Sequence, residues 1–400
     1  MVNKNGSHSI VAACFMIQAV GVGTFVTYGV FFNSLIDELA WSRAVISGAS
    51  SCAFLLSGIF AVLVGRLADK YGPKVLMGVA ALFFGSGFML MSRVHEIWQL
   101  YLFYGIIFGI GLSAVDVIAL TTTARWFTRS RGFMTGVVKV GTGAGQFSIP
   151  FLASILIGIY GWRVAYIIIG AGALMLLLGL SRLLQPYPKH VDENASMGQG
   201  KEREPFCARQ SLTARQAITT EQMWILCGSY LLLVFCLLVV VVHIVPHGTD
   251  VGLTHTSAAG VLSTIGAISM IGRFVSGIAI DRIGSKVIML ICFVILISSL
   301  LWLRVADSLW MLYLFGGVYG LAHGGFFTAI SPIVAEVFGI SGHGAIFGIV
   351  VFSGTIGGAI GPVIAGKMFD LSGSYDPVFT MIIAVSCVSF ALMLLLKPID

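Results

Sequence analysis

Charged residues are scarce in this chain, and their scarcity excludes a water-soluble fold. Only 10% of the 400 residues are charged, whereas 58% are hydrophobic, and the mean hydropathy is +0.98. Soluble domains carry roughly 25% charged residues, which they need to cover their surface. So few charges predict an integral membrane protein.

Motifs for bound metals, nucleotides or covalent catalysis are also missing from the sequence. The seven cysteines form no C-x-x-C or Cys/His spacing for a metal, so we interpret them as small buried hydrophobic residues. There is no GxxxxGK[ST] phosphate loop and no Ser/His/Asp grouping. These absences argue against an ATP-driven pump and a membrane enzyme. They predict no cofactor, no catalytic residue and no metal ligand.

Long apolar stretches fill most of the chain. A helix needs about 20 apolar residues to cross a bilayer, and twelve stretches qualify. They lie at about 10–33, 45–67, 74–92, 98–123, 132–157, 164–184, 223–246, 257–280, 287–304, 309–334, 345–367 and 377–396. The first is too long for a signal-peptide core, so we expect a span rather than a cleaved leader. The sequence therefore predicts an all-α membrane protein with twelve transmembrane helices.

A polar segment separates the sixth stretch from the seventh. It holds most of the clustered charge and is typical of a flexible connector, with a short surface helix expected near 211–217. The predicted organisation is an N-terminal six-helix half over 1–185, a cytoplasmic linker over 186–222 and a C-terminal six-helix half over 223–400.

Lysine and arginine are distributed unequally between the two sides of the predicted membrane. If both termini are cytoplasmic, that side holds 16 of the 23 basic residues, the other side holds five, and two lie within spans. Because basic residues gather in cytoplasmic loops, we expect cytoplasmic termini in a multi-pass protein of the plasma or inner membrane. The same bias accounts for the net charge of +6 without a nucleic-acid partner, and no obligate protein partner is inferred.

The two halves repeat each other at a constant offset. GRLADKYGPK over 65–74 corresponds to GIAIDRIGSK over 277–286, which sets Asp69 and Asp281 212 residues apart. Three further pairs keep this offset: Gly132 with Gly344, Pro150 with Pro362, and Gly161 with Gly373. Tandem six-span halves are a known transporter architecture, in which the substrate site lies near the midplane between them.

Several motifs resemble those of one transporter family. The pattern G-x-x-x-D-[KR]-x-G-x-[KR], present between spans 2 and 3 and again between spans 8 and 9, resembles the signature of the major facilitator superfamily. Narrower features are similar to the monocarboxylate porters and the oxalate/formate-antiporter-like proteins: YGVFFNSLIDELAWSRAVIS (28–47), ARWF (124–127), VHIVPH (242–247), Arg273 in span 8 and HGAIFG (343–348). The resemblance implies two pseudo-symmetric halves in which spans 3, 6, 9 and 12 are peripheral. It suggests a small carboxylate as substrate without fixing which one.

The signature loops hold a candidate gate made of Arg66, Asp69, Asp281 and Arg282. The two acids sit beside the N-termini of spans 3 and 9, where the helix dipole favours negative charge, and basic side chains lie within reach of them. Such a cluster would latch the cytoplasmic ends together in one state and release them in the other. The resemblance implies this gating role for the acids, while a role as topology anchors and turn formers stays open.

Four ionisable residues lie in the middles of spans: Asp116, Lys139, Arg273 and His323. An intramembrane charge costs at least a few kcal/mol and normally faces a cavity or a partner. At 1.5 Å per residue, the first three lie roughly 12–14 Å from the cytoplasmic boundary, close to the midplane. Since Asp116 and Lys139 share this depth on successive spans, we expect an ion pair, with either a structural or a functional role.

Arg273 has no obvious partner in its own half. The acid that animal monocarboxylate porters carry one turn earlier is replaced by Ser269, and the lysine that they carry in span 1 is missing here. A guanidinium offers a carboxylate two donors in one plane. We therefore expect the carboxylate of the substrate to be its partner; bonds to backbone carbonyls or to Asp116 are the alternative.

Further candidates complete the predicted site. An apolar pocket with hydroxyl groups around a short carbon chain is expected from Tyr28, Phe327, Phe352 and Ser353, beside Arg273, Asp116 and His323. Asp116 and His323 are the candidate proton carriers. His323 alternatively contacts the substrate or satisfies a neighbouring carbonyl.

The sequence therefore predicts a secondary active transporter rather than an enzyme. It would move a small monocarboxylate such as lactate or pyruvate together with a proton, by alternating access. A carboxylate/carboxylate exchanger of the oxalate-formate type is the alternative, and a non-transporting membrane sensor is a more distant one.

Overall fold

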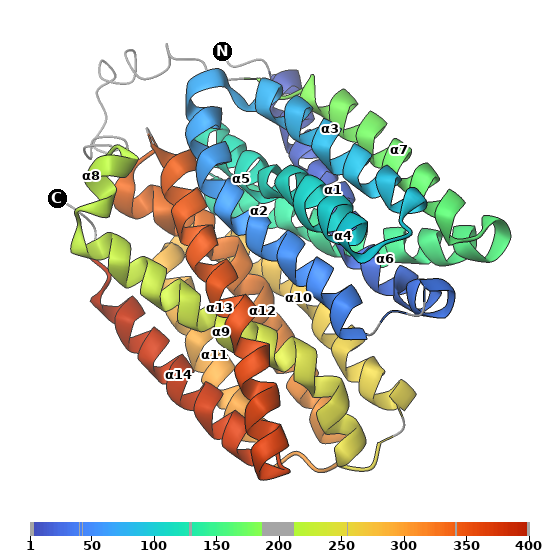
Figure 1. Cartoon of the computed structure of the whole chain (residues 1–400). Coiled ribbons are helices and arrows are strands. Elements are labelled where there is room, and N and C mark those ends of the chain that lie inside the picture. Colours follow the sequence, from blue (N-terminus) through green and yellow to red (C-terminus); the bar gives the residue numbers. More distant parts are fainter. Residues whose placement is uncertain are drawn as a thin grey trace.

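Twelve long helices make up the described part of the chain in the computed structural model (Figure 1). The structure describes residues 4–39, 41, 43–127, 130–185, 212–253, 255–340 and 342–397. Each of the twelve helices is long and apolar enough to cross a membrane, and no strand occurs in these ranges. The predicted all-α protein with twelve spans is confirmed.

The first six spans form one half of the molecule. They are α1 (Lys4–Leu39), α2 (Arg43–Tyr71), α3 (Pro73–Leu90), the composite α4 (Ile97–Leu100), η2 (Tyr101–Phe108) and α5 (Gly109–Trp126), α6 (Arg131–Tyr160) and α7 (Trp162–Ser181). Within the fourth span η2 is π-helical, and the short 3₁₀ turn η1 (Met91–Arg93) follows α3.

The last six spans form the other half. They are α9 (Glu221–Asp250), α10 (His255–Ile283), α11 (Ser285–Leu303), α12 (Leu309–Phe338), α13 (His343–Ser372) and α14 (Asp376–Leu395). The surface helix predicted near 211–217 is present as α8 (Ala214–Ile218), whose first turn is capped by Thr213. Most of the predicted linker lies at 186–211, outside the described residues, so the domain boundaries 1–185, 186–222 and 223–400 stay a prediction.

The two signature loops have the same backbone turn. Gly72, between α2 and α3, has φ 86°, and Gly284, 212 residues later, has φ 88° between α10 and α11. Only glycine adopts this left-handed region without strain. The sequence repeat is therefore a structural repeat down to the conformation of single residues.

The contacts between the halves obey the same repeat. α2 packs on α13, and α6 packs on α10. Four contacts form two equivalent pairs: Gly65 with Gly344 and Gly277 with Gly132, then Gly58 with Thr355 and Met270 with Gly143. In each pair, adding 212 to one residue gives its counterpart. In the first pair glycine meets glycine, and because glycine has no side chain, the helices lie almost backbone to backbone there.

The halves meet on one side of the membrane and separate on the other. α1 begins and α14 ends on the same side, which we call the terminal side (Figure 1). On α6, Gly143 faces Met270, but Phe147, four residues further on the same helix face, is 80% exposed. On α10, no described atom lies within 4 Å of the place that a side chain at Gly266 would take. The space between the halves therefore opens toward the far side.

A polar clasp ties the far-side ends of the first half together. The Glu38 carboxylate on α1 accepts hydrogen bonds from Trp162 Nε1 and from Arg163 Nη2, the latter at 2.8 Å, and Arg163 also donates to the Ser92 carbonyl at 2.8 Å. These bonds from Arg163 and Trp162 lower the pKa of the Glu38 carboxyl below its ordinary 4.5. The stability that the clasp contributes is therefore present above pH 4.5 and is lost as the pH falls through the lowered pKa.

We expect Arg163→Met to lower the thermal unfolding midpoint of the purified protein at pH 7, with the deficit shrinking at acidic pH as Glu38 takes up a proton. The carboxylate is half-exposed, so a modest shift is expected. Arg93→Met is the matched control, because Arg93 is exposed on the same side and forms no ion pair within the described residues. A deficit that is equal at pH 4 and pH 7 would contradict the charge-based account.

Candidate functional site

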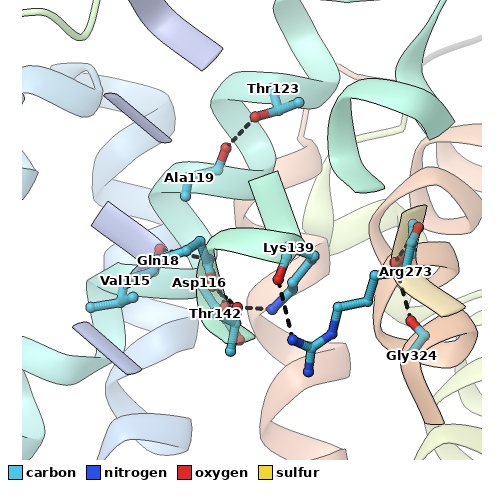
Figure 2. A network of polar contacts seen from close by, with 10 residues as sticks. Gln18, Val115, Asp116, Ala119, Thr123, Lys139, Thr142, Arg273 and Gly324 are labelled. Atoms are coloured by element: carbon cyan, nitrogen blue, oxygen red, sulfur yellow. Dashed lines mark hydrogen bonds and ion pairs between the residues drawn. The ribbon is translucent and has the colours of Figure 1, made fainter. Parts of the chain in front are cut away.

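An ion pair lies in the middle of the first half. Lys139 Nζ on α6 is 2.6 Å from Asp116 Oδ1 on α5 (Figure 2). The same oxygen accepts a hydrogen bond of 2.7 Å from Gln18 Nε2 on α1, and Thr142 Oγ1 donates to Gln18 Oε1 at 2.9 Å. The structure thus brings Asp116 and Lys139 together as expected from their depth, and it adds two polar side chains that hold the pair in place.

The two members of this pair differ in their access to solvent. The Lys139 side chain is 5% exposed, whereas the Asp116 side chain is 40% exposed. Asp116 Oδ1 takes both donors, and Oδ2 accepts no hydrogen bond from any residue that the structure describes. A carboxylate oxygen near the midplane is therefore open to the space between the halves.

Arg273 reaches from the second half toward this pair (Figure 2). Its side chain leaves α10 and donates from Nη1 to the backbone carbonyl of Lys139 at 3.3 Å. The residue is 4% exposed, Nε has no partner, and Nη2 donates to no described residue. A backbone carbonyl, the alternative considered from the sequence, is thus the partner present, and two of the guanidinium nitrogens stay unbonded.

His323 and Phe327 on α12 adjoin the same region. The chain beside His323 packs directly on α10, because a side chain at Gly324 would lie 2.8 Å from the backbone nitrogen of Arg273. The rings of His323 and Phe327 lie 5.1 Å apart, and Lys139 Nζ lies 6.0 Å from the Phe327 ring centre. No hydrogen bond to His323 is found in the described ranges, so the predicted contact with a neighbouring carbonyl is not observed.

The frame around these charges is two-fold symmetric, but the charges are not. At the positions offset by 212, Arg273 is matched by Ala61, Lys139 by Val351 and Asp116 by Thr328. Lys139 and Arg273 together with Asp116 carry one net positive charge when His323 is neutral. Because an uncompensated charge inside a membrane is costly, this arrangement favours the entry of one negative charge.

Two hydroxyl groups expected in the pocket are engaged elsewhere. The Tyr28 hydroxyl donates to the Ile46 carbonyl at 2.8 Å, and its ring stacks on Tyr104 with centres 4.1 Å apart. Ser353 Oγ donates to the Val350 carbonyl of its own helix at 2.7 Å. Both hydroxyl protons are therefore used within the protein, whereas the neighbouring Phe352 is half-buried.

Sequence reasoning missed Gln18 and Tyr230, which occupy equivalent positions at the offset of 212. Gln18 bonds the Asp116 carboxylate in the first half, and Tyr230 belongs to α9 of the second half. Tyr230 packs its ring against Gly354 on α13. Applying the 212-residue offset to every polar residue within a span would have found both.

On the terminal side, each signature acid binds a helix of the opposite half. Asp69 Oδ2 accepts a hydrogen bond from the Ala345 amide at 3.2 Å, in the first turn of α13. Asp281 accepts bonds from the amides of Gly132 at 2.7 Å and Phe133 at 2.9 Å, in the first turn of α6. Ala345 and Phe133 are again 212 residues apart. The carboxylates therefore lie at the N-termini of α13 and α6, where a negative charge is favoured, as well as adjoining in the chain the starts of α3 and α11.

The basic partner of this cluster also differs from the expected one. Asp69 forms an ion pair with Arg125, which belongs to the ARWF segment. Arg66 and Arg282, named from the sequence as gate residues, make no ion pair with either acid in the part of the chain that the structure describes. Arg66 was named from the sequence because it is close to Asp69 in the chain. That α5 ends beside Asp69 is evident only from the fold.

Two six-helix repeats, joined on one side, open on the other and charged at their midplane interface, define a membrane transporter of the type that exposes a central site between its halves. The chain belongs to the major facilitator superfamily, whose family model matches residues 11–299 and 249–400.

Curated relatives place the chain near the monocarboxylate transporters. It is 24% identical to monocarboxylate transporter 12 of Rattus norvegicus over 402 residues, covering 93% of this chain and 81% of that protein. It is 25% identical to monocarboxylate transporter 7 of Homo sapiens, covering 98% and 86%. The chain is therefore a transporter related to this group and not an enzyme.

Solved structures share the fold. The human organic anion transporter MFSD10 (TETRAN) superimposes with a TM-score of 0.76 at 15% identity, covering 96% of this chain and 99% of that one. The fucose:proton symporter of E. coli gives 0.75 at 14% identity, covering 98% of each chain.

Proposed function

We propose that the protein carries a small monocarboxylate such as lactate or pyruvate, together with a proton, by alternating access. The observation that carries this proposal is the single net positive charge at the midplane, with Arg273 unbonded at Nη2 and Nε. One carboxylate would supply the missing negative charge and accept both hydrogen bonds of a planar fork. The relatedness to monocarboxylate transporters supports the same substrate class.

Substrate binding would act directly on the joint between the halves. The bond from Arg273 to the Lys139 carbonyl links α10 to α6 and therefore crosses between the halves. A substrate carboxylate at Arg273 would replace that carbonyl as the acceptor. The cross-half bond would then be lost at the moment when the site is filled, which ties occupancy to the freedom of the halves to rock.

We assign the terminal side to the cytoplasm of a plasma or inner membrane, because 16 of 23 basic residues would then be cytoplasmic. With this orientation the structure is open to the outside and closed to the cytoplasm. The outward opening exposes Asp116, and the closed cytoplasmic side is where the signature acids bind the opposite halves.

A carboxylate/carboxylate exchanger is the second candidate. It is favoured by the ion pair of Asp116 with Lys139, because an acid that already has a cation at 2.6 Å needs no proton for neutrality. Exchange requires only that the empty carrier does not reorient, whereas symport requires a proton-dependent return.

Uptake into proteoliposomes separates the two. We expect radiolabelled lactate to accumulate when an inward proton gradient is imposed on vesicles that contain no substrate. Uptake only into vesicles preloaded with a carboxylate would favour the exchanger. Absence of both, with folded protein in the vesicles, would contradict a carboxylate carrier.

The signature acids would latch the cytoplasmic side, and we expect Asp69→Asn and Asp281→Asn to slow turnover without a matching loss of substrate affinity. Each change weakens charge-assisted bonds to the first turn of a helix in the other half and leaves the midplane site intact. A loss of about 1–2 kcal/mol per latch would shift the balance of the two states by roughly tenfold. Initial rates and the half-saturating concentration should be measured together.

Arg282→Gln is the matched control for this pair, since Arg282 adjoins Asp281 in the chain and forms no ion pair within the described residues. Unchanged rates in both acid variants would reduce Asp69 and Asp281 to turn formers and topology markers.

A further inference from the structure

The open oxygen of Asp116 has a defined chemical preference. Oδ1 is fully used by Gln18 and Lys139, while Oδ2 accepts nothing from the described residues and the side chain is 40% exposed. An ionised carboxylate is an acceptor only. It can bind a ligand hydroxyl or ammonium, repels a carbonyl oxygen, and is left unpaired by a methyl or methylene group.

The Asp116 carboxylate cannot easily turn away to suit other ligands. Gln18 is fully buried and is itself held by Thr142 Oγ1 at 2.9 Å and by the Val115 carbonyl at 3.4 Å. Lys139 fixes the same oxygen from the other side at 2.6 Å. The free lone pairs of Oδ2 are therefore presented by a rigid set of three helices, α1, α5 and α6.

Arg273 and the Asp116 carboxylate contact the same residue, Lys139. The side chain of Lys139 bonds Asp116, and the backbone carbonyl of Lys139 bonds Arg273 Nη1 (Figure 2). Both groups therefore adjoin one residue, and a single ligand would place its carboxylate at the guanidinium and a donor group at Oδ2. The anchor comes from one half and the acceptor from the other.

The charge of the site decides which donor fits. Lys139, Arg273 and Asp116 leave one positive charge, which a monoanion cancels. An amino acid brings an ammonium as well as a carboxylate and would leave that charge in place. A hydroxyl donates without adding charge.

We infer that Asp116 Oδ2 reads the hydroxyl group of a short hydroxymonocarboxylate, so that the carrier selects hydroxy acids over their keto and deoxy analogues. This inference rests on the proposed function, since Arg273 must bind the carboxylate of the same ligand.

The first test uses the intact protein in proteoliposomes and three probes of equal chain length: 2-hydroxypropionate, pyruvate and propionate. Each probe competes with uptake of labelled 2-hydroxypropionate, and a neutral-to-charged hydrogen bond predicts a half-inhibiting concentration at least about tenfold lower for the hydroxy acid than for either analogue. Alanine as a fourth competitor should be as weak as propionate or weaker. Stronger competition by alanine than by propionate would overturn the choice of a hydroxyl over an ammonium.

The second test is Asp116→Asn. The amide offers both a donor and an acceptor, so pyruvate should gain relative to 2-hydroxypropionate and the ratio between them should fall to within about threefold. Asp307→Asn, on the far side outside the network, should leave the ratio unchanged. If all three acids compete within twofold in the unaltered protein, the inference is overturned while the carboxylate carrier stands; if none competes and none is taken up, the proposed function falls with it.

Discussion

Replacing Arg273 with alanine is expected to abolish carboxylate transport while the protein still folds and inserts. Within the described residues the side chain makes a single hydrogen bond, at 3.3 Å to the Lys139 carbonyl, so the fold loses little when it is removed. An alanine also fits this helix crossing, because the equivalent position of the first half is Ala61, which packs against Gly348. What the variant loses is the cation, and losing a charge-assisted pair to a buried anion lowers affinity by about 100-fold or more.

Arg273→Lys should restore only part of this loss, since an ammonium keeps the charge without the planar pair of donors. Substrate affinity, uptake rate and the size-exclusion profile in detergent should be measured for both variants. Arg304→Ala, an arginine at the far end of α11, is the control for general loss of positive charge. Normal carboxylate affinity in Arg273→Ala would end the assignment of this residue as the anion anchor.

Asp116→Asn is expected to retain exchange of carboxylates across the membrane but to lose accumulation driven by a pH gradient. The charge of Asp116 is balanced by Lys139, whose backbone carbonyl accepts a bond from Arg273. A substrate carboxylate would draw Arg273 away from this balance, and Asp116, still ionised while it selects the ligand, would then gain a proton as the halves close around it. Anion and proton would be coupled through one shared cation. An amide cannot change its charge, so the coupling ends while the site can still fill and rock.

Two assays separate these activities: counterflow at equal pH on both sides, and uptake against a concentration gradient with the inside alkaline. Full accumulation by Asp116→Asn would rule out Asp116 as the proton carrier and would leave His323, which has no hydrogen bond within the described residues, or the substrate itself. A variant that is misfolded or absent from the membrane would instead favour a structural role for the Asp116–Lys139 pair.

The fold was predictable because its causes are local or periodic. Apolar stretches of bilayer length predict the spans, and the 212-residue offset predicts the pairing of the halves. Asp116 and Lys139 could be matched by depth alone, since the rise of a helix is fixed. Arg273 stood out because a guanidinium in an apolar stretch demands a partner.

The missed features depend on how helices cross, which the sequence does not display. Arg66 was expected within reach of Asp69, and the sequence does not display that the end of α5 brings Arg125 to this acid and the first turn of α13 brings Ala345. Tyr28 was named for the pocket on residue type, and the sequence does not display that its hydroxyl donates to the Ile46 carbonyl. Gln18 was not predicted as a site residue because its amide carries no charge.

The seam between the halves is built from backbone at Gly65, Gly132, Gly277 and Gly344. Such a seam contains few interlocked side chains that must change rotamer before it can part, and few that lose rotational entropy when it closes. Its opening and closing therefore require few rotamer changes, and the balance of the two states depends on the polar contacts across the seam and on the ligand. Reversing a 1:99 population to 99:1 takes only about 5.5 kcal/mol of differential binding. The differential binding free energy of a ligand of a few atoms can reach that order. A small ligand can therefore shift the arrangement of twelve helices from one state to the other.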